Sequence, residues 1–189
     1  MVDHLLIAGT SHTGKSTLAT DIGSALGWRV ASTDKMGRHP GRPWENAPAH
    51  VLEFYQKMSK TAVHAFLLHH HQNLRPTIAR FVSDMHQEQM PFVLEGAALR
   101  PEYLFEFGSS AVCLVASDAW LRNRIEQNAA YDAQSPDLQV AIDAFTARSL
   151  SENALFATAA KSAGITTLNA EDPNQVTKFA RDFVDRARL

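Results

Sequence analysis

The chain has 189 residues, of which 45% are hydrophobic and 20% charged, the balance of an ordinary globular protein with a well-buried core. Its 18 Lys and Arg residues against 20 Asp and Glu give a net charge of -2, which excludes the basic field that nucleic-acid backbone binding requires. No stretch approaches the ~20 apolar residues of a membrane span, and Met1 to Gly9 is too short for a signal peptide. We therefore expect one domain over residues 1–189, located in the cytoplasm, with no nucleic-acid or membrane partner.

Five short apolar runs predict buried parallel strands, because each run is continuous rather than alternating. In chain order they are Leu5 to Gly9, Trp28 to Ser32, Phe92 to Glu95, Ala111 to Ala116 and Ile165 to Asn169. Helical patterns separate the runs: one helix ends at Gly27, and the last carries an apolar stripe from Val176 to Val184. This alternation predicts an α/β fold of three layers, with helices on both faces of a five-stranded parallel sheet.

Two connections are longer than a simple crossover and predict helical insertions. The first covers about residues 35–90, with helix starts near Pro48 and Pro76. The second covers about residues 120–150, with a break around Tyr131 to Pro136. Long insertions in a compact domain are usually lids or binding elements, so we expect both to lie near a ligand site.

The most specific motif lies between the first strand and the first helix. It reads Gly9-Thr10-Ser11-His12-Thr13-Gly14-Lys15-Ser16-Thr17 and fits the phosphate-binding loop (P-loop) pattern G-x-x-x-x-G-K-[ST]. The glycines let the backbone curl so that successive N–H groups point inward, and the helix N-terminus adds partial positive charge. We expect Lys15 to reach the β- and γ-phosphates of a nucleotide and the Ser16 hydroxyl to ligate Mg²⁺. The predicted nucleotide-binding residues are Gly9, Ser11, His12, Thr13, Gly14, Lys15, Ser16 and Thr17.

Two carboxylates follow predicted strands, at the edge where ligands of open α/β sheets gather. Asp34 follows the second strand, and Glu95 ends the third. Glu95 is expected either to hold a water molecule on Mg²⁺ or to act as the general base. Two structural alternatives stay open: a turn cap for Asp34, and a buried ion pair with Lys15 for Glu95.

Two groups of basic side chains are candidate ligand sites. The loop Arg38-His39-Pro40-Gly41-Arg42-Pro43-Trp44 is stiffened by proline, and its arginines form a candidate cup for an anion, while Trp44 either stacks on an acceptor or pins the loop. Three adjacent histidines, His69 to His71, point in different directions on a helix, which favours a solvated face over a metal site.

The P-loop, the two helical insertions and the five-strand pattern together resemble the P-loop small-molecule kinases. That group includes nucleoside and nucleotide kinases, shikimate- and gluconate-kinase-like enzymes, and antibiotic or sugar phosphotransferases. The likeness spans the whole chain in architecture, but only the P-loop is specific in sequence. It implies the strand order 2-3-1-4-5, an acceptor-binding region in the first insertion and a lid in the second. The basic loop is also similar to a signature of 2-phosphoglycerate-kinase-like proteins.

The resemblance also implies roles for individual residues. Kinases of this group often place an acidic residue at the position of Asp34 to orient or deprotonate the acceptor hydroxyl. Arg100 is similar to an arginine that holds an anionic group of the acceptor. Arg124 and Arg148 are the expected lid arginines, which neutralise charge on the transferring phosphoryl group. A surface arginine or a helix ion pair is the alternative for each arginine.

The sequence therefore predicts an ATP-dependent phosphotransferase that uses Mg²⁺ and a small acceptor, either anionic or hydroxylated. No guanine-reading N/T-K-x-D motif occurs, which favours ATP over GTP. The predicted catalytic residues are Lys15, Asp34, Glu95, Arg124 and Arg148, and the predicted acceptor residues are Asp34, Arg38, Arg42, Trp44 and Arg100. Two other functions stay open: a nucleotide-hydrolysing switch, which would need a water-positioning residue after Glu95, and a non-catalytic nucleotide sensor.

Overall fold

The computed structural model describes residues 2–189 and contains a five-stranded sheet in which every neighbouring pair of strands is parallel. The strands are β1 (His4–Ala8), β2 (Arg29–Ser32), β3 (Phe92–Glu95), β4 (Ala111–Val115) and β5 (Thr166–Asn169). Their order is β2-β3-β1-β4-β5, which confirms the order that the resemblance implies. The P-loop strand β1 therefore lies at the centre of the sheet, with β3 and β4 beside it.

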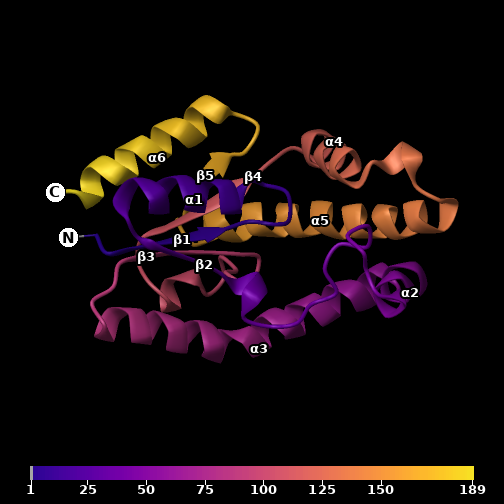
Figure 1. Cartoon of the computed structure of the whole chain (residues 1–189), viewed down its shortest axis with the longest axis horizontal. Helices are drawn as coiled ribbons and strands as arrows, with labels where there is room; N and C mark the ends of the chain where they lie inside the picture. The colour runs from indigo at the N-terminus through magenta and orange to yellow at the C-terminus, as the bar shows by residue number, and fades with distance from the viewer. Residues whose placement is uncertain (1) are drawn as a thin grey trace.

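Helices cover both faces of this sheet (Figure 1). They are α1 (Lys15–Leu26), α2 (Ala49–Lys57), α3 (Lys60–Gln87), α4 (Asp118–Ala129), α5 (Pro136–Ser162) and α6 (Pro173–Ala187), with short 3-10 helices η1 (Thr33–Lys35), η2 (Leu104–Glu106) and η3 (Tyr131–Ala133). Leu5 and Ile7 point toward α1 and α6, whereas Leu6 and Ala8 point toward α3 and α5. Each central strand is thus buried on both faces, as its continuous apolar run predicts.

A third apolar cluster lies beside the sheet rather than over it. Residues of α2, α4, the start of α3 and the first half of α5 form it, including Val51, Leu67, Ile125 and Phe145. Figure 1 shows these segments together at one end of the molecule, beyond the carboxyl ends of the strands. Parts of the two predicted insertions therefore form one helical lobe, while the rest of α3 packs on the sheet. The expected break between α4 and α5 is confirmed by η3.

Two expectations about local structure are wrong. Pro76 was expected near a helix start, but it lies inside α3, where a long helix with a buried face tolerates one missing N–H group. The second and fifth strands were expected to be buried, but both are edge strands and mostly accessible; Val30 of β2 is 42% exposed. None of the helices within residues 2–189 has a segment apolar enough to span a membrane.

Candidate functional site

The backbone between β1 and α1 curls as the P-loop motif predicts. His12 and Gly14 have positive φ angles of 67° and 88°, in the left-handed region. Gly9, at φ 141°, lies so close to β4 that a Cβ atom there would be 2.7 Å from the carbonyl oxygen of Leu114. A side chain at residue 9 would therefore push the loop away from the sheet, which accounts for the first glycine of the motif.

The first turn of α1 has free backbone N–H groups. No side chain caps this helix at Gly14. The short helix α2, after Pro48, also has no side-chain cap, whereas side chains accept hydrogen bonds from the first turns of α3, α4, α5 and α6, at Ser59, Ser117, Ser135 and Asp172. An uncapped helix start that opens into a pocket offers N–H donors and partial positive charge to a phosphate group.

Lys15 is buried at the centre of the loop. Its side chain is turned back on the loop, and Nζ donates a hydrogen bond of 2.7 Å to the Thr10 carbonyl oxygen. Burial lowers the pKa of Lys15, and the carboxylates of Glu95 and Asp34 act in the opposite direction. The ammonium group thus lies within the combined field of two carboxylates at the ends of neighbouring strands.

Ser16, in the first turn of α1, contacts Glu95 at the end of β3. The Ser16 hydroxyl donates a hydrogen bond of 3.1 Å to Glu95 Oε1, although the two residues are 79 positions apart in the chain. Glu95 is 5% exposed and is placed by β3, the neighbour of the P-loop strand. A hydroxyl and a carboxylate oxygen at this separation are the hard oxygen ligands that Mg²⁺ prefers, so these two residues fit the predicted ion.

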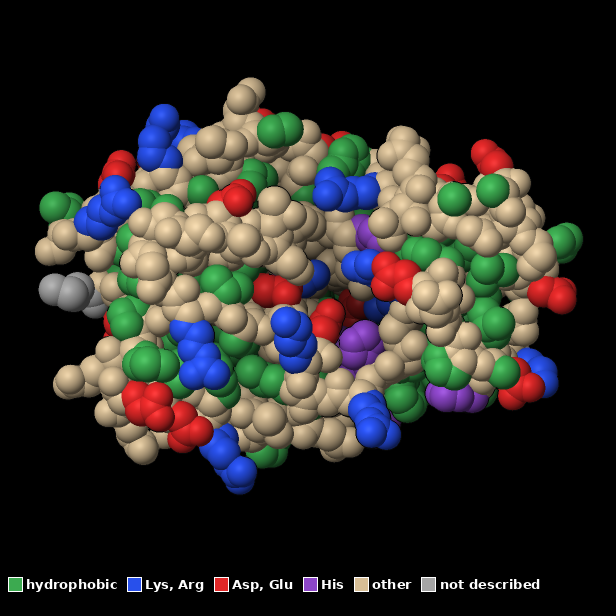
Figure 2. Space-filling model, in the orientation of Figure 1, with side chains coloured by type: hydrophobic (Ala, Val, Ile, Leu, Met, Phe, Trp, Pro, Cys, Tyr) green, Lys and Arg blue, Asp and Glu red, His purple; other side chains and the backbone are tan. Residues whose placement is uncertain are grey.

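A single pocket of about 570 Å³ joins the P-loop to the helical lobe. Figure 2 shows a hollow at the middle of the molecule, where basic, acidic and histidine side chains gather. Among the predicted site residues, its lining contains Ser11, His12, Gly14, Lys15, Ser16, Thr17, Asp34, Arg42, Glu95, Arg124 and Arg148. The phosphate-binding residues and the two predicted carboxylates therefore share one cavity.

The loop from Arg38 to Trp44, which we call the basic loop, lines this pocket only in part. Arg42 lines the pocket and pairs with Glu45, whereas Arg38 and Trp44 are outside the lining. The Trp44 ring packs 4.9 Å from that of Phe145, and its Nε1 donates to Asn128 Oδ1 at 3.2 Å. Trp44 thus holds the loop against the lobe, the second of its two predicted roles.

Asn128 also contacts the P-loop. His12 Nε2 lies 3.1 Å from Asn128 Oδ1, and the His12 ring is 5.8 Å from that of Trp44. Burial lowers the pKa of His12 to about 4, although the hydrogen bond to Asn128 opposes this. A neutral imidazole therefore links the P-loop to α4 near neutral pH.

The three predicted arginines have different surroundings. Arg124 lines the pocket, with its guanidinium 4.9 Å from the Trp120 ring centre. Arg148 also lines the pocket and donates to Glu152 Oε2 at 3.1 Å. Arg100 is 3% exposed, outside the pocket lining, and pairs with Glu102 at 2.8 Å. Arg124 and Arg148 thus face the cavity, while Arg100 lies behind its wall.

Sequence reasoning missed Glu152. This carboxylate is 1% exposed and lies on α5, one helical turn after Arg148. It accepts a hydrogen bond of 3.2 Å from Thr10 Oγ1, and its other oxygen is 3.6 Å from Arg100 Nη1. Burial acts to raise the pKa of Glu152, but Arg148, His71, Arg100 and the Thr10 hydrogen bond together lower it. The Arg148–Glu152 spacing of four residues was the available signal, but that spacing usually marks a surface pair.

The histidine run was also misjudged. His69 is exposed as expected, but His70 is half-buried and His71 is only 5% exposed. Both His70 and His71 line the pocket, and together with Leu67 and Leu74 they form one stripe of α3. The three rings do point in different directions, and that geometry turns one of them inward.

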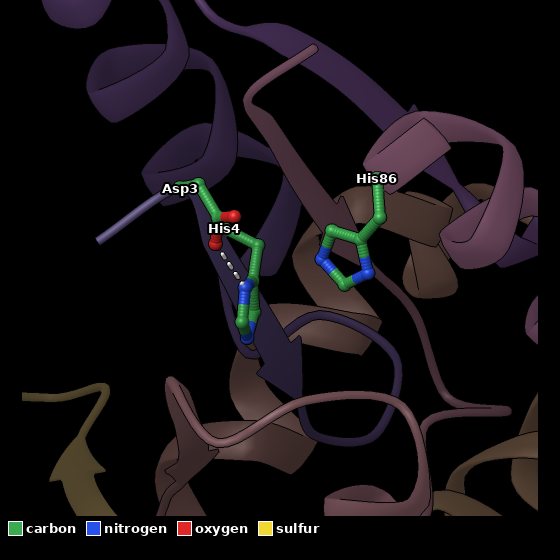
Figure 3. A group of neighbouring side chains, drawn as sticks. All are labelled: Asp3, His4 and His86. Atoms are coloured by element: carbon green, nitrogen blue, oxygen red, sulfur yellow. Dashed lines mark hydrogen bonds and ion pairs between the residues drawn. The ribbon is translucent and has the colours of Figure 1, made fainter. Parts of the chain in front are cut away.

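A second polar cluster lies at the opposite edge of the sheet, where β1 begins (Figure 3). Candidate ligand atoms of Asp3, His4 and His86 lie within 4.8 Å of one another. However, His4 Nδ1 is 2.7 Å from Asp3 Oδ1, and His4 Nε2 accepts a bond of 3.4 Å from the Ser110 N–H. Because Nε2 accepts a hydrogen bond, Nδ1 carries the ring proton and donates it in the hydrogen bond to Asp3. The one lone pair of the neutral His4 ring is therefore already in use and is not free for a metal.

No protein-family model matches the sequence, and no curated protein matches it. Among solved structures, the chain is similar to a gluconokinase from Sinorhizobium meliloti 1021, with 14% identity, a TM-score of 0.54 and coverage of 97% of this chain and 92% of the other. It is similar to a shikimate kinase from Bacteroides thetaiotaomicron, with 16% identity, a TM-score of 0.53 and 98% coverage of both chains.

A dephospho-CoA kinase from Campylobacter jejuni is similar as well, with 17% identity, a TM-score of 0.52 and coverage of 100% of this chain and 96% of the other. The likeness extends over almost the full length of each of these three chains. At these identities the likeness establishes the fold, which is that of the P-loop small-molecule kinases.

Proposed function

We propose that the protein is an ATP-dependent phosphotransferase that moves the γ-phosphoryl group of ATP to a hydroxyl group of a small acceptor. The observation that carries this proposal is the single pocket that joins Lys15 and Ser16 of the P-loop to Asp34, Glu95 and the α3 stripe. A nucleotide-binding module alone needs only the P-loop end. The additional volume beyond the two carboxylates provides room for a second substrate.

The P-loop residues would bind the phosphates. Backbone N–H groups at the start of α1 donate to phosphate oxygens, and Lys15 leaves the Thr10 carbonyl to reach the β- and γ-phosphates. Arg124, on α4, would add a second cation from the pocket lining. Two cations from different elements would neutralise charge as it develops on the transferring group.

Ser16 and Glu95 are the residues proposed to hold the metal, because their oxygens already lie 3.1 Å apart. Mg²⁺ bound there would neutralise charge on the β- and γ-phosphate oxygens. Asp34, exposed in η1 directly after β2, is the proposed general base, because it lines the same pocket as the P-loop and the α3 stripe. Arg148 orients the acceptor from α5. Closure of the lobe would exclude water, which otherwise competes as acceptor.

The experiment that tests this function is ADP release measured with Mg·ATP, with and without candidate acceptors. A phosphotransferase releases ADP only when an acceptor is present. Acceptor-independent turnover would indicate a hydrolytic switch, and nucleotide binding without any turnover would indicate a sensor. Formation of the phosphorylated acceptor, followed by mass spectrometry, identifies the product directly.

A further inference from the structure

The part of the pocket away from the P-loop has a definite chemical character. We call it the acceptor subsite, and it is lined by Tyr55, Leu67, His70, His71, Leu74, Ala97, Ala98, Phe145 and Arg148, whose guanidinium lies 4.4 Å from the centre of the Phe145 ring. Leu67, His70, His71 and Leu74 follow one another at spacings of three, one and three residues, so they form a single face of α3. This face of α3 therefore presents two leucine side chains and two imidazoles to the subsite.

The cations near this subsite are already paired. Arg148 is bound to Glu152, and Arg42 is bound to Glu45. Behind the wall, Arg100 is held by Glu102 and Glu152. An anionic acceptor would have to compete with these carboxylates for each guanidinium group. The subsite is thus close to electrically neutral.

The two imidazoles do not supply positive charge. Burial lowers the pKa of His71 to about 4, and burial also lowers that of His70. Within residues 2–189, His71 Nδ1 is buried without a hydrogen-bond partner. The His71 ring itself lines the cavity, and a neutral imidazole offers one donor and one acceptor, so it is suited to a hydroxyl group of a ligand, which brings no charge.

The carboxylates of Asp34 and Glu95 also disfavour an anionic acceptor. Asp34 and Glu95 both border the pocket between the P-loop and the acceptor subsite. Lys15 and Arg124 are the cations that the proposed function assigns to the nucleotide phosphates. A second anion beyond them would be repelled by Asp34 and Glu95 and would lose its hydration without a free cation in return.

We propose that the acceptor is an uncharged, hydroxylated molecule with an apolar face, held against the α3 stripe with a hydroxyl on His71. This inference rests on the proposed phosphotransferase function and replaces the wider expectation of an anionic or hydroxylated acceptor. It assigns the selection of the acceptor to helix α3 rather than to the arginines of the basic loop.

Matched pairs of probes that differ in charge test the proposal. Suitable pairs are glucose and glucuronate, uridine and uridine monophosphate, and 4-hydroxybenzyl alcohol and 4-hydroxybenzoate. With Mg·ATP present, the uncharged member of at least one pair should raise ADP release, with a kcat/KM about tenfold or more above that of its charged partner. Higher kcat/KM for the charged members would overturn the inference while leaving the phosphotransferase function intact. ADP release that is the same with and without each of the probes would contradict both proposals.

Two neighbouring histidines provide a matched pair of variants. His71→Ala should raise the KM of the best uncharged probe about three- to tenfold, the loss expected for one neutral hydrogen bond, without changing the KM for ATP. His69→Ala removes an exposed imidazole from the same helix and should leave both constants unchanged. Equal effects of the two substitutions on the acceptor KM would contradict the assignment of His71 to the acceptor. Melting curves of both variants verify that each one is folded.

Discussion

The hydroxyl of Thr10 donates a hydrogen bond of 3.2 Å to the buried carboxylate of Glu152, which follows 142 residues later on α5. The same carboxylate binds Arg148 of the pocket and Arg100 behind it. The carbonyl of Thr10 meanwhile accepts the hydrogen bond from Lys15. A short chain of polar contacts therefore connects the phosphate-binding loop to the acceptor side of the pocket.

Glu152→Gln should destabilise the fold. The substitution keeps the shape of the side chain but leaves Arg148 without a carboxylate partner and Arg100 with Glu102 alone, and breaking a buried pair costs about 3–5 kcal/mol. Urea unfolding measures the loss. Glu53→Gln is the control, because Glu53 forms an exposed pair with Lys57 that should contribute no more than about 1 kcal/mol. Equal losses for the two variants would show that the Glu152 network contributes little to stability.

Stability should depend on pH through His71. Burial lowers the pKa of His71 from 6.5 to about 4, with His70, Arg100 and Arg148 acting in the same direction and Glu152 against it. The unfolded chain therefore binds more protons between these pH values. The contribution of the neutral His71 side chain to the free energy of unfolding is therefore fully present above pH 6.5, and it is lost as the pH drops toward 4. Melting temperatures recorded from pH 7.5 to 4.5 measure this slope.

A substitution isolates the contribution of His71 to that slope. His71→Gln removes the titrating group, so the melting temperature of this variant should fall less between pH 6.5 and 4.5 than that of the wild-type protein. His69→Gln, at an exposed position on the same helix, should keep the wild-type slope. Indistinguishable slopes for wild type and His71→Gln would mean that the imidazole is not held neutral by burial.

Ser16→Ala tests the proposed metal ligands. Without the hydroxyl that now contacts Glu95, the Mg²⁺ concentration for half-maximal ADP release should rise by about 10- to 100-fold. Thr20→Ala is a matched control, because the Thr20 hydroxyl lies one turn further along α1 and donates to the Ser16 carbonyl at 2.8 Å. An unchanged Mg²⁺ requirement in Ser16→Ala would remove Ser16 from the metal site.

The features that could be predicted from the sequence are those encoded locally. The P-loop depends on glycines at fixed spacing and on a strand and a helix on either side of it, all within about thirty residues. Gly27 ends α1 at a positive φ of 67°, where the capping pattern expects it. The carboxyl ends of parallel strands meet at one edge, so Asp34 and Glu95 could be assigned to one site before any coordinates were known.

The features that could not be predicted depend on long-range packing. Glu152 is significant only because α5 passes behind the P-loop, and no local pattern encodes that contact. The accessibility of β2 follows from its place at the sheet edge, while its apolar run resembles that of a central strand. His71 is buried because this face of α3, rather than the one with His69, turns toward the lobe.

Substitution of Lys15 tests the central claim most directly. In Lys15→Ala, acceptor-dependent ADP release should fall by about 100-fold or more, because the charge on the transferring phosphoryl group loses its buried cation. The far-UV circular dichroism should stay that of the wild-type protein, and Lys57→Ala, at an exposed lysine on α2, should retain full turnover. Acceptor-dependent turnover that survives in folded Lys15→Ala would contradict the account.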